Sequence, residues 1–187
     1  MRCIAVDLEM NQPSRKIIQI GAICFEPDTG KIVDKFHMFV NPGEPISPEI
    51  VKLTRITDEM VNFSPNIQVV AQRFTDFKKS LQANPIGIVW GAGTSNDIRK
   101  IYEESGLDNP FHVRIIDVKA VFQMLANTSS AEMRQKCGLK RACEILKIGW
   151  ALDHGEPHNA LADAFNTYRL YMFLSKCLKG GVNIKMG

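Results

Sequence analysis

The segment Arg2-Cys3-Ile4-Ala5-Val6-Asp7-Leu8-Glu9 decides the fold, because it has the pattern of a mostly apolar strand that enters a core. Side chains alternate between the two faces of a strand, so Asp7 and Glu9 leave the same face. The opposite face carries the apolar residues Ile4, Val6 and Leu8. Two carboxylates on an apolar strand repel each other and resist desolvation, and a divalent cation offsets that cost. Taken alone, the pair fits either a metal site or a strand end that emerges into water.

The two segments that follow continue the strand pattern. Residues 16–25 are rich in isoleucine, and residues 31–40 form a third apolar stretch. Between them, Asp28-Thr29-Gly30 predicts a turn. Because these three strands follow one another without room for helices, we predict an antiparallel meander.

From Ser47 onward the apolar residues recur at helical spacing. Ser47-Pro48-Glu49 predicts a helix start, and a longer amphipathic helix is predicted after Ser64-Pro65. The remaining predicted elements are short strands at 86–90 and 113–116, a helix capped by Ser95 or Asn96 that runs to about Ser105, a helix starting near Asp117, and helices over 139–148 and 159–177. The fold class is therefore α/β, with a mixed five-stranded sheet of meander and parallel strands flanked by helices.

Length and composition limit the class of protein. At 187 residues, the chain fits one domain over residues 1–180, with a loose tail over 181–187. The net charge of +3 permits a polyanionic partner without requiring one. No signal peptide and no apolar run of about 20 residues is present, so no membrane partner is expected. The five cysteines are odd in number and form no C-x-x-C pair, which favours free thiols and an intracellular, cytoplasmic location.

Three further residues are candidates for the same site. Asp97 follows the predicted strand 86–90 at a strand-to-helix turn, a position that lines clefts in α/β proteins. His158 and Asp163 are five residues apart, about 140° around an ideal helix. They can face one site only if His158 lies on the loop before the helix and Asp163 lies within it. A helix-start aspartate, a solvent-facing histidine and a surface aspartate remain the alternative interpretations.

The order of these residues resembles the DEDDh exonucleases, the DnaQ-like family of the ribonuclease H-like fold. The resemblance covers about residues 4–175 and rests on Asp7, Glu9, Asp97, His158 and Asp163. Residues 17–22 (Ile-Ile-Gln-Ile-Gly-Ala) resemble the second strand of that family, and residues 39–42 followed by residues 53–59 resemble its substrate-binding segment. The sequence departs from many members where Met10 and Asn11 replace two threonines, and residues 92–96 lengthen the gap before Asp97.

The resemblance implies a two-metal-ion mechanism with two Mg²⁺ or Mn²⁺ ions. Asp7 would bridge both ions, Glu9 and Asp163 would hold the ion that binds the attacking water, and Asp97 would support the other ion. His158 would act as general base. The implied reaction is 3′→5′ exonucleolytic hydrolysis of single-stranded DNA or RNA to 5′ mononucleotides.

The resemblance also points to Met10, Thr54 and Ile56 as contacts for the terminal nucleoside, with ordinary core packing as the alternative for Met10 and Ile56. The preference between DNA and RNA is left open, as is the choice between a lone chain, a homodimer and association with a polymerase. Two competing functions are an endonuclease or phosphodiesterase on the same fold and an inactive nucleic-acid-binding or polymerase-associated scaffold.

Overall fold

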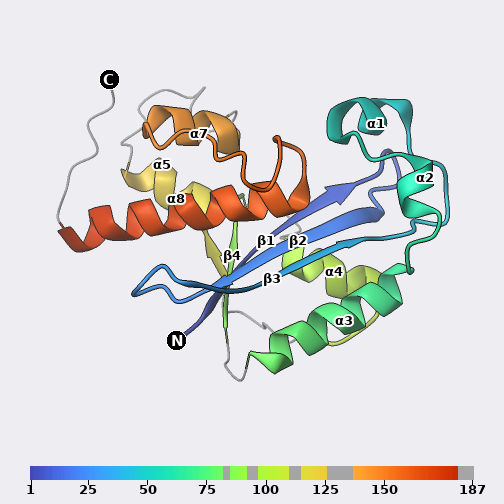
Figure 1. The fold of residues 1–187 in the computed structure, drawn as a ribbon, viewed down its shortest axis with the longest axis horizontal. Helices are drawn as coiled ribbons and strands as arrows, with labels where there is room; N and C mark the ends of the chain where they lie inside the picture. Colours follow the sequence, from blue (N-terminus) through green and yellow to red (C-terminus); the bar gives the residue numbers. More distant parts are fainter. Residues whose placement is uncertain (82–84, 92–96, 110–114, 126–136, 181–187) are drawn as a thin grey trace.

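The computed structural model describes residues 1–81, 85–91, 97–109, 115–125 and 137–180 (Figure 1). Its centre is a five-stranded sheet with the strand order β3-β2-β1-β4-β5. The predicted mixed sheet is confirmed, with an antiparallel meander at one side and parallel strands at the other.

The strands lie close to the predicted segments. They are β1 (Cys3–Met10), β2 (Ile17–Phe25), β3 (Ile32–Phe39), β4 (Ile86–Val89) and β5 (Ile115–Asp117). β1 pairs antiparallel with β2 and parallel with β4, so it lies at the middle of the sheet. The carboxylates that the sequence singles out therefore lie on the central strand, near its carboxyl end.

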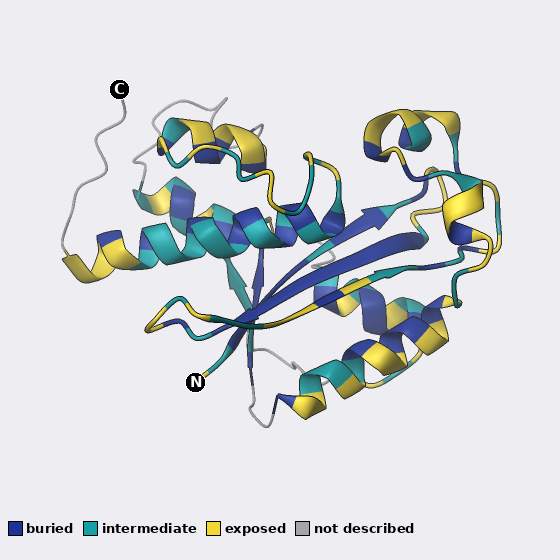
Figure 2. Ribbon diagram, in the orientation of Figure 1, coloured by how far each residue is buried: buried dark blue, intermediate teal, exposed yellow. Residues whose placement is uncertain are grey.

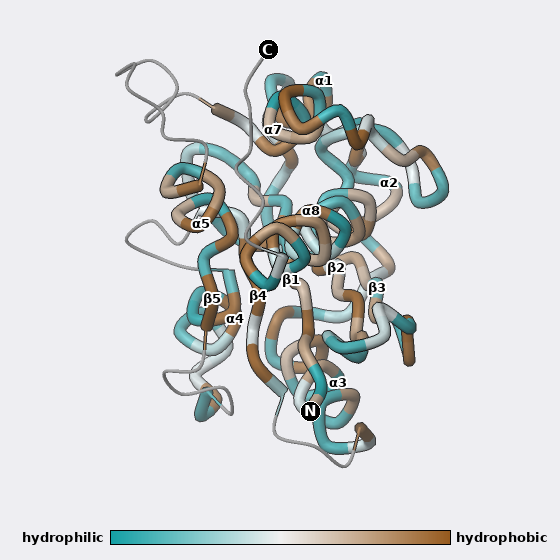
Figure 3. Tube along the Cα trace, turned by 90° about the vertical axis from the view of Figure 1, so that its left-hand side faces the viewer, coloured by the Kyte–Doolittle hydropathy of each residue, from teal (hydrophilic) through white to brown (hydrophobic). Residues whose placement is uncertain are grey.

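Helices cover both faces of the sheet (Figure 1). One face packs against α3 (Ile67–Ser80) and α4 (Asp97–Ser105). The other face packs against α5 (Val118–Leu125), α7 (Leu139–Ile145) and the long α8 (Ala160–Gly180). In the side view of Figure 3, apolar segments of the strands lie between α8 and α3, which is the arrangement of a three-layered α/β domain.

The alternation of side chains along β1 divides the core into two clusters. Ile4, Val6 and Leu8 pack with residues of α3 and α4, whereas Cys3 and Ala5 pack with residues of α5, α7 and α8. Figure 2 shows the central strands as almost wholly buried. Because the odd-numbered residues of β1 face α8, the next two odd positions direct the carboxylates toward that helix.

Two short helices, α1 (Pro48–Thr54) and α2 (Asp58–Val61), lie beyond the end of the sheet at which β1 ends (Figure 1). Their apolar residues form a separate small cluster with Ile18 of β2. The sequence predicted a helix start at Pro48 and no helix at α2. All five cysteines are buried and free. Among the described residues, no helix has both the length and the apolar character needed to cross a bilayer.

Several boundaries differ from the sequence prediction by up to three residues, and α8 runs three residues further than predicted, to Gly180. β5 ends at Asp117, one residue later than predicted. The Asp117 carboxylate accepts hydrogen bonds from the N–H groups of Lys119 and Ala120, so it caps α5, the helix predicted to start near this residue. α7 ends at Ile145 instead of residue 148, because Lys147 has a left-handed backbone with φ of 57°. The predicted cap at Ser95 or Asn96, the start of the strand at 113 and the tail at 181–187 lie outside the described residues.

Candidate active site

The carboxyl end of β1 supplies two acids to the face of the sheet that α8 covers. In the register of β1 and β2, Asp7 lies opposite Gly21 and Glu9 lies opposite Gln19. Residues directly opposite each other on paired strands share a face, so the acids point toward the start of α8. Glu9 is only 8% exposed. Burial of two neighbouring carboxylates demands a compensating positive charge.

The start of α8 brings His158 and Asp163 to the same place. α8 begins at Ala160, and the side chain of Asn159 accepts hydrogen bonds from the N–H groups of Leu161 and Ala162, at 3.1 and 3.3 Å. His158 therefore lies on the loop before the helix and Asp163 lies in its first turn, as the spacing predicted. His158 has a left-handed backbone, with φ of 66°, which lets its ring turn back toward the sheet.

Gly21 allows α8 to approach the sheet at this point. A Cβ atom on Gly21 would lie 2.2 Å from the carbonyl carbon of Ala160, far inside any tolerated contact. Because Gly21 is the partner of Asp7 in the sheet, the closest approach of the helix occurs beside the acids. The sequence motif contained this glycine, but only the packing explains it.

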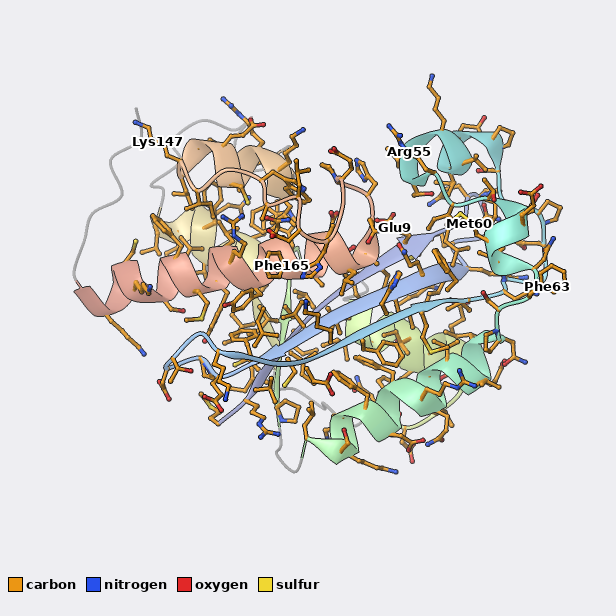
Figure 4. The ribbon with its side chains drawn as sticks, in the orientation of Figure 1. Glu9, Arg55, Met60, Phe63, Lys147 and Phe165 are labelled. Atoms are coloured by element: carbon orange, nitrogen blue, oxygen red, sulfur yellow. The ribbon has the colours of Figure 1, made fainter. Side chains whose placement is uncertain are left out.

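Side-chain atoms of Glu9, His158 and Asp163 that can bind a metal lie within 4.8 Å of one another. Figure 4 shows Glu9 at the end of β1, beside the beginning of α8. The Oδ1 atom of Asp163 is buried and has no hydrogen-bond partner among the described residues. A buried carboxylate oxygen without a partner is costly, and a cation would satisfy it. Oxygen-rich ligands suit Mg²⁺ and Mn²⁺, so the residues fit a hard divalent cation.

Asp97, the first residue of α4, completes a set of four interacting acids. Burial, followed by the charges of the other three carboxylates, raises the pKa of Asp7 well above its usual value. Burial and then the charges of Asp163 and Asp97 raise the pKa of Glu9 to about 8. The cluster thus joins the ends of three elements that are far apart in sequence.

The pKa values of the two remaining acids, Asp97 and Asp163, are also raised. Burial raises the pKa of Asp97 to about 7. Burial also raises the pKa of Asp163 to about 7, although a hydrogen bond from the backbone of His158 acts in the opposite direction. Without a cation, the four acids would therefore hold more protons near neutral pH than ordinary carboxyl groups do, and a bound cation would displace protons.

The three predicted nucleoside contacts differ in their surroundings. Met10 is partly buried at the end of β1. The hydroxyl of Thr54 donates to the carbonyl of Ile50 at 2.8 Å and accepts from the N–H of Ile56 at 3.1 Å. Ile56 is 2% exposed and packs in the cluster around Ile18. Their contact with a nucleoside therefore stays a prediction, and both Thr54 and Ile56 have structural roles of their own.

Two side chains of α8 that were not predicted from the sequence hold the loop before His158. Asn166 on α8 is fully buried, and its amide accepts from the N–H of Ala151 and donates to the carbonyl of Ala151. Arg169, one turn further, donates to the carbonyls of Ile148 and Gly149. These contacts fix residues 148–151 against α8. In the sequence, these two side chains stood out only as polar residues among the apolar residues of α8.

Comparison with known proteins gives matches over most of the chain. The family model described as Exonuclease, RNase_T, matches residues 4–171. The "DNA polymerase III PolC-type" protein of Pediococcus pentosaceus is 31% identical over 162 residues, which are 85% of this chain. Those residues are 10% of the length of that polymerase, so the chain spans a small part of this relative.

Solved structures share the fold. The nuclease domain of 3′hExo, described as a DEDDh family member bound to rAMP, has a TM-score of 0.79 and 19% identity, covering 100% of this chain and 96% of that one. Exonuclease I of E. coli, in complex with a dA16 oligonucleotide, has a TM-score of 0.68 and 14% identity. The match covers 94% of this chain and 40% of that one. With the family model spanning the four acids and the histidine, the chain belongs to the Exonuclease family, and it shares its ribonuclease H-like fold with the nuclease domain described as a DEDDh family member.

Proposed function

We propose that the protein is a 3′→5′ exonuclease that hydrolyses single-stranded DNA or RNA from its 3′ end and releases 5′ mononucleotides. The main support for this proposal is that four carboxylates and one histidine lie close together at one site. One carboxylate oxygen there, Oδ1 of Asp163, is buried and has no hydrogen-bond partner among the described residues. A scaffold that only binds nucleic acid gains nothing from burying four mutually repelling acids. A hydrolase that depends on divalent cations, as this family does, requires them.

The residues fit two divalent cations, Mg²⁺ or Mn²⁺, held by Asp7, Glu9, Asp97 and Asp163. Bound there, the cations would acidify the attacking water and offset the charge that develops on the leaving 3′ oxygen. Asp7 lies on the central strand, and the charges of the other three acids act on it, so it would hold a cation together with them. Glu9 and Asp163 share the side of the site where His158 lies.

In the proposed reaction, His158 takes the proton from the attacking water. Its side chain is exposed, so it can reach water and substrate, and its ring atoms lie within 4.8 Å of ligand atoms of Glu9 and Asp163. The hydrogen bond from its backbone to the carboxylate of Asp163 links the base to a residue of the metal site. A positioned general base contributes about 10²–10⁴-fold to a reaction of this kind.

The comparisons support nucleic acid as the substrate class without choosing between its two forms. One structural neighbour was solved with rAMP and another with a DNA oligonucleotide. The PolC-type relative supports a second candidate role, removal of mispaired 3′ ends beside a DNA polymerase. That role would require a preference for DNA with an unpaired 3′ end over single-stranded RNA.

The test uses 5′-labelled single-stranded DNA, single-stranded RNA of the same sequence, and a DNA duplex with a mispaired 3′ end. Each is incubated with Mg²⁺, with Mn²⁺ and with chelator. We expect shortening from the 3′ end that stops with chelator and in Asp7→Ala. Asp76→Ala, an exposed change on α3, is the matched control and should leave the ladder unchanged. Cleavage at internal bonds would favour the endonuclease, and binding without cleavage would favour the scaffold.

A further inference from the structure

A buried amide links the outer part of the sheet to the start of α8. Gln19 is fully buried, although its neighbours on β2 are apolar. It lies opposite Glu9 in the register of β1 and β2, so its side chain is on the face that carries the acids. A buried amide is unfavourable unless its donors and acceptor are satisfied, so its partners indicate what it does.

The oxygen of this amide caps α8. Oε1 of Gln19 accepts a hydrogen bond from the N–H of Ala160, the first residue of the helix, at 2.9 Å. The first N–H groups of a helix have no partner within the helix. Asn159 accepts the next two, from Leu161 and Ala162. The cap from Asn159 is local in sequence. The cap from Gln19 lies 141 residues away in sequence and connects the helix to the sheet.

The other end of the amide contacts His37 on β3. The amide nitrogen of Gln19 lies 2.8 Å from Nε2 of His37. An amide nitrogen can only donate, so Nε2 of His37 must be the unprotonated, accepting nitrogen of the ring. The N–H of Ala160 fixes the orientation of the amide, because in the flipped form the NH₂ group would face that N–H. The ring of His37 is exposed and packs edge-on against Phe39, with centroids 5.4 Å apart.

Ala160 lies between the two site residues that α8 and its loop supply. A shift of this residue along or away from the sheet would move His158 and Asp163 together, relative to Glu9 on β1. Gly21 lets the helix touch the sheet at this point, but absence of a side chain supplies no attraction. The Gln19–Ala160 hydrogen bond supplies a directed contact that fixes the position.

We propose that Gln19 is a positioning residue of the active site, with its amide oriented by His37, and that it sets the distance between the α8 residues and Glu9. The inference rests on the proposed exonuclease function for its kinetic readout. Gln19 touches neither water nor substrate in this role and acts through Ala160. A displacement of catalytic groups by about 1 Å can cost about 10²-fold in rate.

The test compares Gln19→Met, which keeps the side-chain length and loses the amide, with Gln19→Glu, which keeps an oxygen for Ala160 and offers the other to a protonated His37. For Gln19→Met we expect kcat to fall by about 10- to 100-fold while KM stays within about 2-fold, because positioning and not substrate binding is lost. Gln19→Glu should recover most of kcat. The affinity for Mn²⁺, measured by calorimetry, should weaken in Gln19→Met and recover in Gln19→Glu.

If Gln19→Met does not fold, two variants of His37 still test the role of the Gln19 amide. His37→Phe removes the acceptor at an exposed position and should lower kcat, whereas His37→Gln keeps an acceptor and should lower it less. Asn66→Ala is the matched control, because Asn66 caps α3, a helix without site residues, by accepting from the N–H of Val69. It should lower thermal stability and leave kcat and the Mn²⁺ affinity unchanged.

The outcomes separate this inference from the proposed function. If Gln19→Met loses stability as Asn66→Ala does but keeps wild-type kcat and Mn²⁺ affinity, Gln19 is only a core residue and the proposal is overturned. If the wild-type protein cleaves no nucleic acid, the proposed function fails, and the Mn²⁺ affinities of the same variants still decide the role of Gln19. An unchanged kcat in His37→Phe would overturn the part assigned to His37.

Discussion

His158 adopts a backbone conformation that residues with a side chain rarely use. Its φ of 66° lies in the left-handed region, which costs of order 1 kcal/mol for a non-glycine residue. Neighbouring contacts must maintain it, and Asn159 does so by starting α8 directly after it. The strain therefore occurs where the loop must turn the imidazole back toward Asp163.

We predict that His158→Ala lowers kcat by about 10²–10⁴-fold, because the proposed general base is lost while the acids remain. The substitution should leave Mn²⁺ affinity nearly unchanged if His158 acts on water alone. Single-turnover cleavage of the labelled strand and calorimetry measure the two quantities. His154→Ala, in the same loop, is the control, since His154 packs edge-on against Phe165, with centroids 4.5 Å apart. A large loss of Mn²⁺ affinity in His158→Ala would instead make His158 a metal ligand.

At the scale of the elements, the contact between β2 and the first turn of α8 decides whether the site forms. Gly21 and Ala160 are in contact there, and no side chain fits between them. On the other side of α8, Asn166 and Arg169 hold residues 148–151. The helix is thus located by its start and by the loop before it, which are the parts that carry the site residues.

We predict that Gly21→Ala moves the start of α8 and nearly abolishes activity, with a loss of stability of about 1–3 kcal/mol from overpacking. The added Cβ would meet backbone atoms, which cannot rotate away as a side chain can. Thermal unfolding and strand cleavage measure both effects. Gly138→Ala is the control, because a Cβ there meets nothing within 4 Å. Normal cleavage by Gly21→Ala would show that α8 can shift without harm.

For the whole molecule, we expect the buried acids to make stability depend on pH and on divalent cations. The pKa of Glu9 is raised to about 8, and those of Asp97 and Asp163 to about 7, so the folded chain holds more protons than the unfolded chain between about pH 4 and pH 8. Stability of the cation-free protein should therefore be greatest at the acidic end of this window and fall as pH rises through it.

We predict that Mn²⁺ raises the melting temperature more at pH 8 than at pH 5.5, because the ligands must lose protons to bind it. In chelator at pH 8, Asp7→Asn should be more stable than the wild type by about 1–2 kcal/mol, since it removes one repelling charge at the cost of function. Calorimetric scans across pH measure both effects. A destabilised Asp7→Asn, or a cation effect independent of pH, would contradict the electrostatic account.

Much of the fold followed from local patterns. The alternation in residues 2–9 predicted which side chains of β1 share a face, and the packing of Ile4 and Cys3 in opposite clusters confirms it. The end of α7 was predicted too late, because the left-handed turn at Lys147 has no clear marker in the sequence. α2 was missed because four residues carry too little periodicity to detect.

The sequence by itself determined the five candidate site residues and their family, because carboxylates on an apolar strand and a fixed order of motifs are local features. It also predicted that, to face one site, His158 must lie before the helix and Asp163 within it, since residues five apart on one helix point about 140° apart. Only the tertiary structure decided that Gln19 caps α8 across 141 residues and that Gly21 meets Ala160. Such contacts depend on how segments that are distant in sequence pack together, and the spacing of residues along the chain does not predict this packing.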